Sequence, residues 1–349
     1  MTLNVIKIFF LGALSFIMAF SLAPILIKLL YKYKLWRKQI REKSIDGKEL
    51  IFFKKFHSKE ESHVPRFGGL LIWTSTLTLI FLFFLLSKTN IWWFQKLNFL
   101  SRSQTWLPLF ALIAASIVGL IDDVFQVLGK GKYIGGGLQL KYRLMLVFLI
   151  GLIGGWWFYY KLGYSTIHIP GNGDIFIGIW YIPIFVLIML AVYTSGVIDG
   201  LDGLAGGVFA IIFASFTGIS LFRGQIDLAS FCSVIVGAIL AFLWFNIPPA
   251  RFYMGETGIL GLCSALTVIA FLTDSVLILP VVGFLLVVES LSVILQLLSK
   301  RFFKKKIFLA SPIHHHFEAM GWPGYKITMR FWVVGIVFAL IGVAIRLLG

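Results

Sequence analysis

The feature that most constrains this chain is a series of apolar runs, each close to the roughly 20 residues that an α-helix needs to cross a bilayer. Read along the chain, these runs predict about ten membrane spans. Their approximate ranges are 5–30, 67–87, 107–122, 143–161, 175–196, 203–222, 228–246, 257–273, 276–298 and 331–348. The ninth is expected to be bent or broken. We interpret residues 1–349 as one all-α polytopic membrane domain, with cytoplasmic loops at about 31–66, 123–142, 197–202, 247–256 and 299–330.

Composition supports a membrane protein rather than a large soluble core. Hydrophobic residues make up 59% of the chain and charged residues 13%, with a mean hydropathy of +0.94. Soluble domains carry roughly 25% charged residues. The two cysteines, Cys232 and Cys263, both lie inside apolar runs, so the sequence suggests neither a disulfide framework nor a zinc site. The first run is too long for a signal peptide and lacks a small-residue cleavage site, so it is interpreted as the first span.

The distribution of positive charge predicts the orientation. The basic residues of the two richest connections are Lys32, Lys34, Arg37, Lys38, Arg41, Lys43, Lys48, Lys54, Lys55, Lys59 and Arg66, then Lys300, Arg301, Lys304, Lys305, Lys306, Lys326 and Arg330. Both connections fall on the same side, which the positive-inside rule makes cytoplasmic, so both termini are expected outside. Anionic lipid headgroups account for much of the net charge of +16, and nucleic acid is not required.

Acidic residues gather at the cytoplasmic ends of the predicted spans. Asp122 and Asp123 close the third span, Asp199 and Asp202 lie between the fifth and sixth, and Glu256 lies between the seventh and eighth. One alternative is that they are ordinary solvated loop residues. Five carboxyl groups in short, glycine-rich connections with few other polar residues favour a functional site, because ionisable groups at membrane depth are costly.

These acids suggest a hard cation and a phosphate. Clustered carboxylates without His or Cys spacing suit an oxygen-preferring ion, and Mg²⁺ is usual where phosphates supply other ligands. The glycines of DGLDGLAGG, residues 199–207, are explained either by close helix packing or by backbone amides that approach a phosphate or ribose.

Three consecutive histidines, His314, His315 and His316, stand in the last cytoplasmic connection. A purification tag is disfavoured, because tags are longer and lie at termini. Transition-metal binding is also disfavoured, since adjacent residues of a regular element cannot all face one ion. We expect these side chains to bind or orient phosphate oxygens near the metal.

In this order and at these spacings, the motifs resemble the polyprenyl-phosphate N-acetylhexosamine-1-phosphate transferases, and among them the phospho-N-acetylmuramoyl-pentapeptide transferases. The resemblance covers essentially the whole chain. Its blocks are Pro65 with Gly68 and Gly69, Asp122 and Asp123, DGLDGLA at 199–205, WFN at 244–246, Met254 and Gly255, VESLSVILQ at 288–296, PIHHH at 312–316, GWP at 321–323 and RFW at 330–332. The histidines with GWP distinguish this branch from enzymes that use N-acetylglucosamine-phosphate donors.

The resemblance implies a ten-span fold with both termini outside, in the bacterial cytoplasmic membrane and with the active site facing the cytoplasm. It also implies transfer of phospho-MurNAc-pentapeptide from UDP-MurNAc-pentapeptide to undecaprenyl phosphate, which gives lipid I and UMP. Mg²⁺ is the implied cofactor. The implied partners are both substrates, membrane lipids and, since dimers are common in the family, a second copy.

The resemblance also implies roles for single residues. Asp122 and Asp123 are the expected catalytic pair, one of them deprotonating or orienting the lipid phosphate. Glu256 stands where the family has a Mg²⁺-binding aspartate, so it joins Asp122 and Asp123 among the expected catalytic residues, and all three are the expected metal ligands. The remaining expected substrate-binding residues are Asp199 and Asp202 at the nucleoside, Asn246 and Tyr253 near the uracil, and His314, His315 and His316 at the phosphates or the sugar-peptide portion.

Several positions depart from the family pattern around the nucleotide pocket. Glu256 replaces aspartate, Gly196 stands where asparagine is usual, and Gln126 stands where lysine is common. The segment before the second span, residues 64–69, is also altered. The lysine that the family usually has shortly before it aligns with Glu61, and Lys59 can replace that lysine only if the loop shifts. We expect activity to persist while the affinity for uridine-mimicking inhibitors differs.

Three other functions compete with this one. The same reaction with UDP-GlcNAc or a related UDP-sugar is the alternative within the family. An ion-coupled transporter also carries acids in its helices, but near the bilayer midplane, whereas these lie at span ends. A non-catalytic scaffold is the third.

Overall fold

The computed structural model describes residues 2–38, 63–130 and 136–349. Most of the cations of the first predicted cytoplasmic loop fall in 39–62, outside the described residues, as do Lys59 and Glu61.

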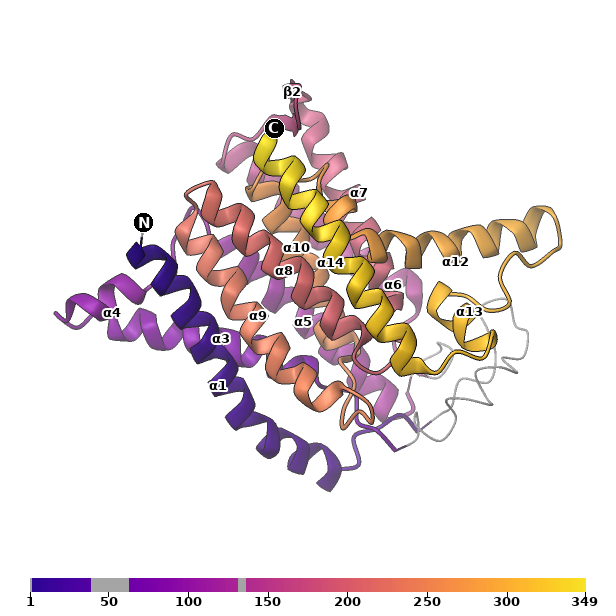
Figure 1. Ribbon diagram of the computed structural model, residues 1–349. Helices are drawn as coiled ribbons and strands as arrows, with labels where there is room; N and C mark the ends of the chain where they lie inside the picture. The colour runs from indigo at the N-terminus through magenta and orange to yellow at the C-terminus, as the bar shows by residue number, and fades with distance from the viewer. Residues whose placement is uncertain (1, 39–62, 131–135) are drawn as a thin grey trace.

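The described chain is a bundle of long helices (Figure 1). The long helices are α1 Thr2–Lys32, α3 Gly69–Leu86, α5 Trp106–Val127, α6 Leu140–Trp156, α7 Tyr181–Thr194, α8 Leu204–Phe222, α9 Ile226–Asn246, α10 Gly255–Leu272, α12 Phe284–Phe302 and α14 Gly324–Leu348. The short elements are α4 Trp92–Leu97, η1 Trp157–Lys161, η2 Gly178–Trp180, η3 Ser195–Ile198, α11 Leu279–Val282 and α13 Ile313–Ala319.

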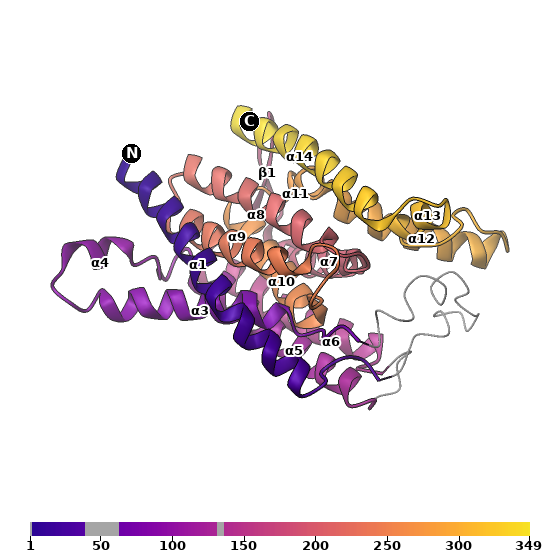
Figure 2. The same ribbon diagram turned by 60° about the horizontal axis from the view of Figure 1, so that its bottom comes forward.

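Nine helices in the described residues are long and apolar enough to cross a membrane. Each coincides with one of the predicted spans, so the prediction of an all-helical, multi-pass membrane protein is confirmed. The short third span is longer than predicted, since α5 continues to Val127. N and C lie at the same end of the bundle (Figures 1 and 2).

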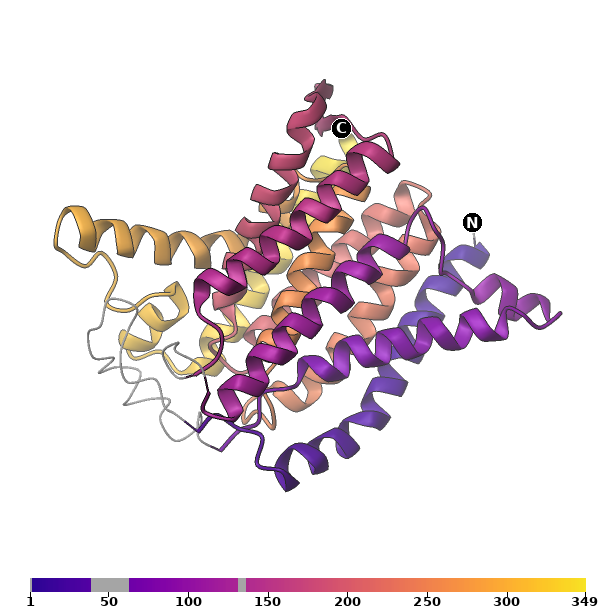
Figure 3. The same cartoon turned by 180° about the vertical axis from the view of Figure 1, so that it is seen from behind.

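The remaining predicted span, 276–298, is broken, as expected. The four-residue helix α11 ends at Val282, Gly283 follows, and α12 then leaves the bundle sideways (Figures 1 and 3). A salt bridge 2.6 Å long joins Arg223, just after α8, to Asp274 in the turn after α10, so both helices end on the same side of the bundle. Because α14 begins at the other end, where Thr328 donates a hydrogen bond to the Asp202 carbonyl, the broken segment returns the chain across the bundle.

Helix α10 lies at the centre of this arrangement. Of its apolar window, 94% of the residues are buried, and it packs mainly against α5, with α3 and α7 on other sides. Small residues let the backbones approach: a Cβ at Gly69 would collide with the Gly258 backbone. Close helix contacts through small residues are typical of membrane bundles, where apolar side chains gain little by leaving lipid.

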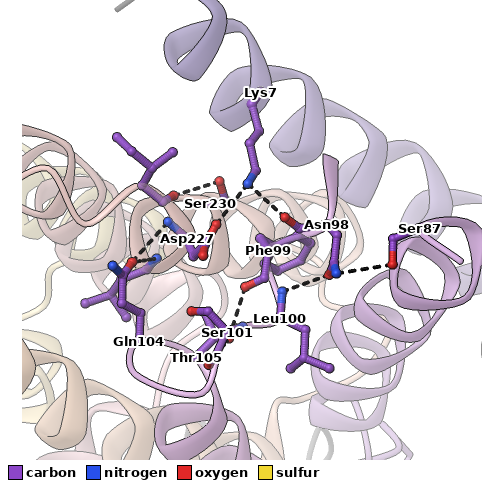
Figure 4. A network of polar contacts seen from close by, with 12 residues as sticks. Lys7, Ser87, Asn98, Phe99, Leu100, Ser101, Gln104, Thr105, Asp227 and Ser230 are labelled. Atoms are coloured by element: carbon purple, nitrogen blue, oxygen red, sulfur yellow. Dashed lines mark hydrogen bonds and ion pairs between the residues drawn. The ribbon is translucent and has the colours of Figure 1, made fainter. Parts of the chain in front are cut away.

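Polar contacts tie helices together at the end of the bundle that carries the termini (Figure 4). The Lys7 ammonium of α1 donates to the Asp227 carboxylate of α9 and to the Asn98 carbonyl, both at 2.9 Å. The Gln104 side-chain oxygen accepts from the Asp227 and Leu228 amides, which are among the otherwise unpaired donors at the start of α9. This network joins α1, the segment before α5 and α9.

One two-stranded antiparallel hairpin in the described residues was not predicted. Strands β1 Thr166–Ile169 and β2 Gly173–Phe176 pair Thr166 with Phe176 and Ile169 with Gly173. The turn between them holds Gly171 and Gly173 at positive φ, which only glycine adopts readily. The predicted span 175–196 therefore begins inside a strand, and the helical crossing starts later, at Gly178.

Candidate active site

The aspartate pair lies in the last turns of α5, where the helix passes out of the apolar core. Asp122 is fully buried. One of its oxygens, Oδ1, accepts the Leu138 amide at 2.5 Å, and Oδ2 accepts the Gln126 side-chain amide at 2.6 Å. Backbone and amide donors are what a buried carboxylate requires, since an unpaired charge there would be strongly destabilising.

Asp123 points instead at the start of α10. Its oxygens accept from the Glu256 amide at 3.2 Å, the Thr257 amide at 2.9 Å and the Thr257 hydroxyl at 2.7 Å. The first amides of a helix have no partner within the helix, and a negative charge there is stabilised by the helix dipole. Gly255 has a φ of +71°, and a Cβ on it would lie 2.6 Å from Asp123 Oδ2. The carboxylate of α5 therefore acts as the cap of α10.

Capping α10 in this way brings Glu256 beside the pair. Arg143, from the first turn of α6, faces both acids: its Nη1 lies 2.5 Å from Glu256 Oε1 and its Nε lies 3.7 Å from Asp122 Oδ1. The Arg143 side chain is only 6% exposed, so this charge is enclosed within the site. Sequence reasoning did not single out Arg143. The available signal was a cation at the start of an apolar span on the same side as the acids.

The next acids join the same region. Asp199, directly after η3, accepts the Gly255 amide at 3.2 Å, so it too holds the start of α10. Asp202 accepts the Ala250 amide at 2.9 Å. The structure thus brings the acids of three separate connections together around the ends of α5, α8 and α10. Their roles toward substrates stay predictions.

The predicted uracil residues differ in how open they are. Asn246 is buried, and its side chain spans two backbone groups, accepting from the Gly203 amide at 3.0 Å and donating to the Phe252 carbonyl at 2.9 Å. Tyr253 is half-buried, and its backbone pairs with the segment before α3 through the Pro65 carbonyl and the Gly68 amide, both at 2.8 Å. Asn246 therefore joins the loop before α8 to the loop before α10, while Tyr253 is less enclosed than Asn246.

The three histidines lie on the short helix α13 and face different neighbours. His314 is fully buried and pairs through Nδ1 with Glu289 of α12 at 2.9 Å, while its Nε2 abuts Gly200 so closely that any side chain there would collide. His315 pairs with Glu318 at 2.6 Å. His316 accepts the Leu309 amide at 3.1 Å. His314 therefore contacts the DGLDG loop directly, at Gly200.

Glu289 belongs to the VESLSVILQ motif at 288–296, but the sequence alone indicated no role for it. The buried pair with His314 joins α12, which leaves the bundle, to α13 and to the loop of Asp199. The signal that could have found it is an ionisable residue inside an apolar run.

The donor chemistry of the Asp122 region fits Mg²⁺, since this ion prefers carboxylate oxygens. Among the described residues, no three His, Cys, Asp or Glu side chains converge to hold a metal ion on their own. A cation shared with substrate phosphates needs only one or two carboxylates. Asp122 and Glu256, which Arg143 brings together, supply that number of carboxylates.

An open hollow of about 520 Å³ is lined by Leu138, whose backbone amide binds the buried Asp122 carboxylate behind it. Lys130 and Lys141 also line it. A concave surface with two cations beside a carboxylate pair suits a phosphate-bearing ligand.

The chain was compared with known proteins. It matches the model of the family described as Glycosyl transferase family 4 over residues 105–274. It is 36% identical over 337 residues to the phospho-N-acetylmuramoyl-pentapeptide-transferase of Geobacillus thermodenitrificans (strain NG80-2), with 96% of each chain covered. The enzymes of the same name from Clostridium perfringens (strain 13 / Type A) and Bacillus subtilis (strain 168) are 36% and 34% identical, covering 97% of this chain and 98% of theirs.

Proposed function

Because this chain belongs to the phospho-N-acetylmuramoyl-pentapeptide transferase family, within glycosyl transferase family 4, we propose that it transfers phospho-MurNAc-pentapeptide from UDP-MurNAc-pentapeptide to undecaprenyl phosphate. The products are lipid I and UMP, in the first membrane step of peptidoglycan synthesis. The observation that carries the proposal is similarity to enzymes of that name over nearly the whole chain. The gathering of acids around the start of α10 supports it.

The proposed step is a direct displacement. An oxygen of the lipid phosphate attacks the phosphorus bonded to the sugar, and the new P–O bond forms as the bond to UMP breaks with its electron pair leaving on UMP. Asp122 orients the lipid phosphate or takes its proton, while Asp123 holds the start of α10 in place. Arg143 offsets part of the negative charge that gathers when the two phosphate groups meet.

Mg²⁺ is the proposed cofactor, held through Glu256 and the Asp122–Asp123 pair together with phosphate oxygens. When bound, it neutralises charge on the phosphates and on the departing UMP. Glu256 places its carboxylate about one methylene farther from the backbone than the family's aspartate. That change is tolerated better by a metal ligand than by an attacking nucleophile, which favours direct attack by the lipid phosphate.

The other substrate contacts are proposed from the family. Asp199, Asp202, Asn246 and Tyr253 are assigned to the nucleoside end, with Asn246 acting through the loops it spans. The residues His314–His316 are assigned to the phosphates or the sugar-peptide portion. We place the enzyme in the bacterial cytoplasmic membrane with this site facing the cytoplasm, among membrane lipids and as a homodimer.

The test is product identification by mass spectrometry with purified protein, UDP-MurNAc-pentapeptide, undecaprenyl phosphate and Mg²⁺. Lipid I and UMP are expected, and radiolabelled UDP-GlcNAc offered in parallel should yield no product. A GlcNAc-linked lipid in the absence of lipid I would overturn the donor assignment while keeping the reaction class.

A further inference from the structure

A buried arginine outside the aspartate pair is joined to it through a glutamine. Arg37 follows α1 and is 2% exposed. Its Nη2 donates to Gln126 Oε1, and Gln126 Nε2 donates to Asp122 Oδ2 at 2.6 Å. All three side chains are buried, so the row of contacts runs through the interior rather than across the surface.

The side-chain amide of Gln126 lies between the charges of Arg37 and Asp122 and can transmit the effect of one to the other. A glutamine accepts with its oxygen and donates with its nitrogen at the same time. A cation on the oxygen draws electron density from the amide, so the nitrogen becomes a stronger donor to the carboxylate, and in a buried chain of this kind the bonds reinforce one another. Arg37 thereby acts on Asp122 without touching it.

We propose that Arg37 is a positioning residue that holds the Asp122 carboxylate, through Gln126, in the orientation required for the displacement. This inference rests on the proposed function of Asp122. Gln126 lies four residues after Asp122 on α5, so a cationic side chain at position 126 is close enough for a direct i,i+4 contact with Asp122. In this chain the cation stands on a different segment and the glutamine spans the gap.

A purely mechanical role is the competing explanation: Arg37 would only fasten the segment after α1 to α5. A double variant that moves the cation from position 37 to position 126, the swap, distinguishes the two roles. In the double variant Arg37→Met with Gln126→Lys, the link between the segments is lost, but a cation again faces Asp122. Recovery of turnover in this variant requires the electrostatic role.

The variants are Arg37→Met, Gln126→Leu, the two together, and the swap, with Lys38→Met as the matched control because Lys38 is the neighbouring cation and is exposed. The rate of lipid I formation, KM for each substrate and thermal unfolding in detergent are measured. Arg37→Met should lower kcat about tenfold, as expected for a hydrogen bond to a charged group. KM for the nucleotide donor should change less than twofold, and Lys38→Met should behave as wild type.

Two further results bear on the proposal. Arg37→Met and Gln126→Leu should lower kcat by about the same factor. The double variant of these two changes should lower it no further than either single change, because both residues act on Asp122 through the same chain of contacts. The swap should return kcat to within about threefold of wild type even if its unfolding temperature stays low. A swap as inactive as Arg37→Met, or additive single losses, would overturn the inference. Failure of the wild type to make lipid I would instead count against the proposed function, and the same variants would then be compared with the donor that the wild type accepts.

Discussion

At the scale of single residues, the two aspartates of α5 have unlike surroundings although they are neighbours in sequence. Asp123 gives both oxygens to the start of α10, whereas Asp122 accepts the Leu138 and Gln126 amides and lies near Arg143. This division agrees with the proposal that Asp122 acts on the lipid phosphate while Asp123 holds the start of α10.

Asp122→Asn is therefore expected to lower lipid I formation by about 10²–10⁴-fold, the usual range for loss of a positioned acid or base. The protein should remain folded, since the amide is isosteric. Thermal unfolding and product formation in the same preparation check both statements. Asp227→Asn, the same change at the opposite end of the bundle, should leave turnover within about twofold, because the Asp227 carboxylate pairs with Lys7, far from the site. Equal activity of Asp122→Asn and wild type would remove Asp122 from the mechanism.

The sequence allowed the acids of this site to be predicted because charged groups stand out at the ends of apolar runs. Arg143, Arg37 and Glu289 were not recognised, for a shared physical reason. Each acquires its importance from a partner far away in sequence, and local patterns carry no information about which helix ends meet.

At the scale of elements, α1 and α9 approach so closely at Gly237 that no side chain fits at that position. A Cβ at Gly237 would collide with the Gly12 carbonyl and lie 3.0 Å from the Phe16 amide nitrogen, both backbone atoms of α1.

We expect Gly237→Ala to force the two helices apart and to destabilise the protein by about 1–3 kcal/mol, as overpacking does elsewhere. Gly218→Ala on α8 is the matched control, because a Cβ there meets nothing within 4 Å. Thermal unfolding in detergent compares the two. If both variants unfold at the same temperature, the close contact between α1 and α9 is not a source of stability.

The turn after α10 provides a prediction about pH. Burial raises the pKa of Asp274 above its ordinary value of 3.8, although Arg223 acts to lower it. Because the folded state binds this proton more tightly than the unfolded state, the stabilisation is complete below about pH 4 and is lost as pH rises through the raised pKa. Asp274→Asn should therefore gain stability relative to wild type above the raised pKa, with a difference that shrinks on acidification.

Asparagine is the suitable replacement because residue 274 has a φ of 46°, a region that asparagine tolerates better than most residues. Unfolding temperatures of both proteins between about pH 4 and 8 provide the measurement. A difference that is constant across this range would contradict the assigned cause.

The helices themselves were predictable from apolar length, but two features of the elements were less so. The break at Gly283 was expected only as a bend or break, because a lone glycine does not say whether a helix continues. Residues 166–176 were predicted to be partly a loop and partly the start of the fifth span, so the hairpin was missed. Its strands are four residues each and too short to show a clear alternating pattern.

At the scale of the whole molecule, orientation in the membrane remains a prediction from the basic loops. It can be tested with single introduced cysteines, because Cys232 and Cys263 are buried and should not react. A cysteine at Asn172, in the exposed hairpin turn, is expected to react with a membrane-impermeant maleimide in intact spheroplasts. One at Lys305, also exposed, should react only after permeabilisation. The reverse pattern would place the active site outside.

The enclosure of α10 limits where the enzyme can move during turnover. With 94% of its apolar window buried, against 28% for the helix that carries Arg143, α10 cannot tilt or slide without repacking the core. It is thus the fixed frame against which the acids are held. We expect movement during turnover to fall on the elements around α10 rather than on α10 itself, since mobile parts are drawn from the least enclosed elements. Ligands that immobilise those surrounding elements should therefore stall the enzyme even while its carboxylates remain in place.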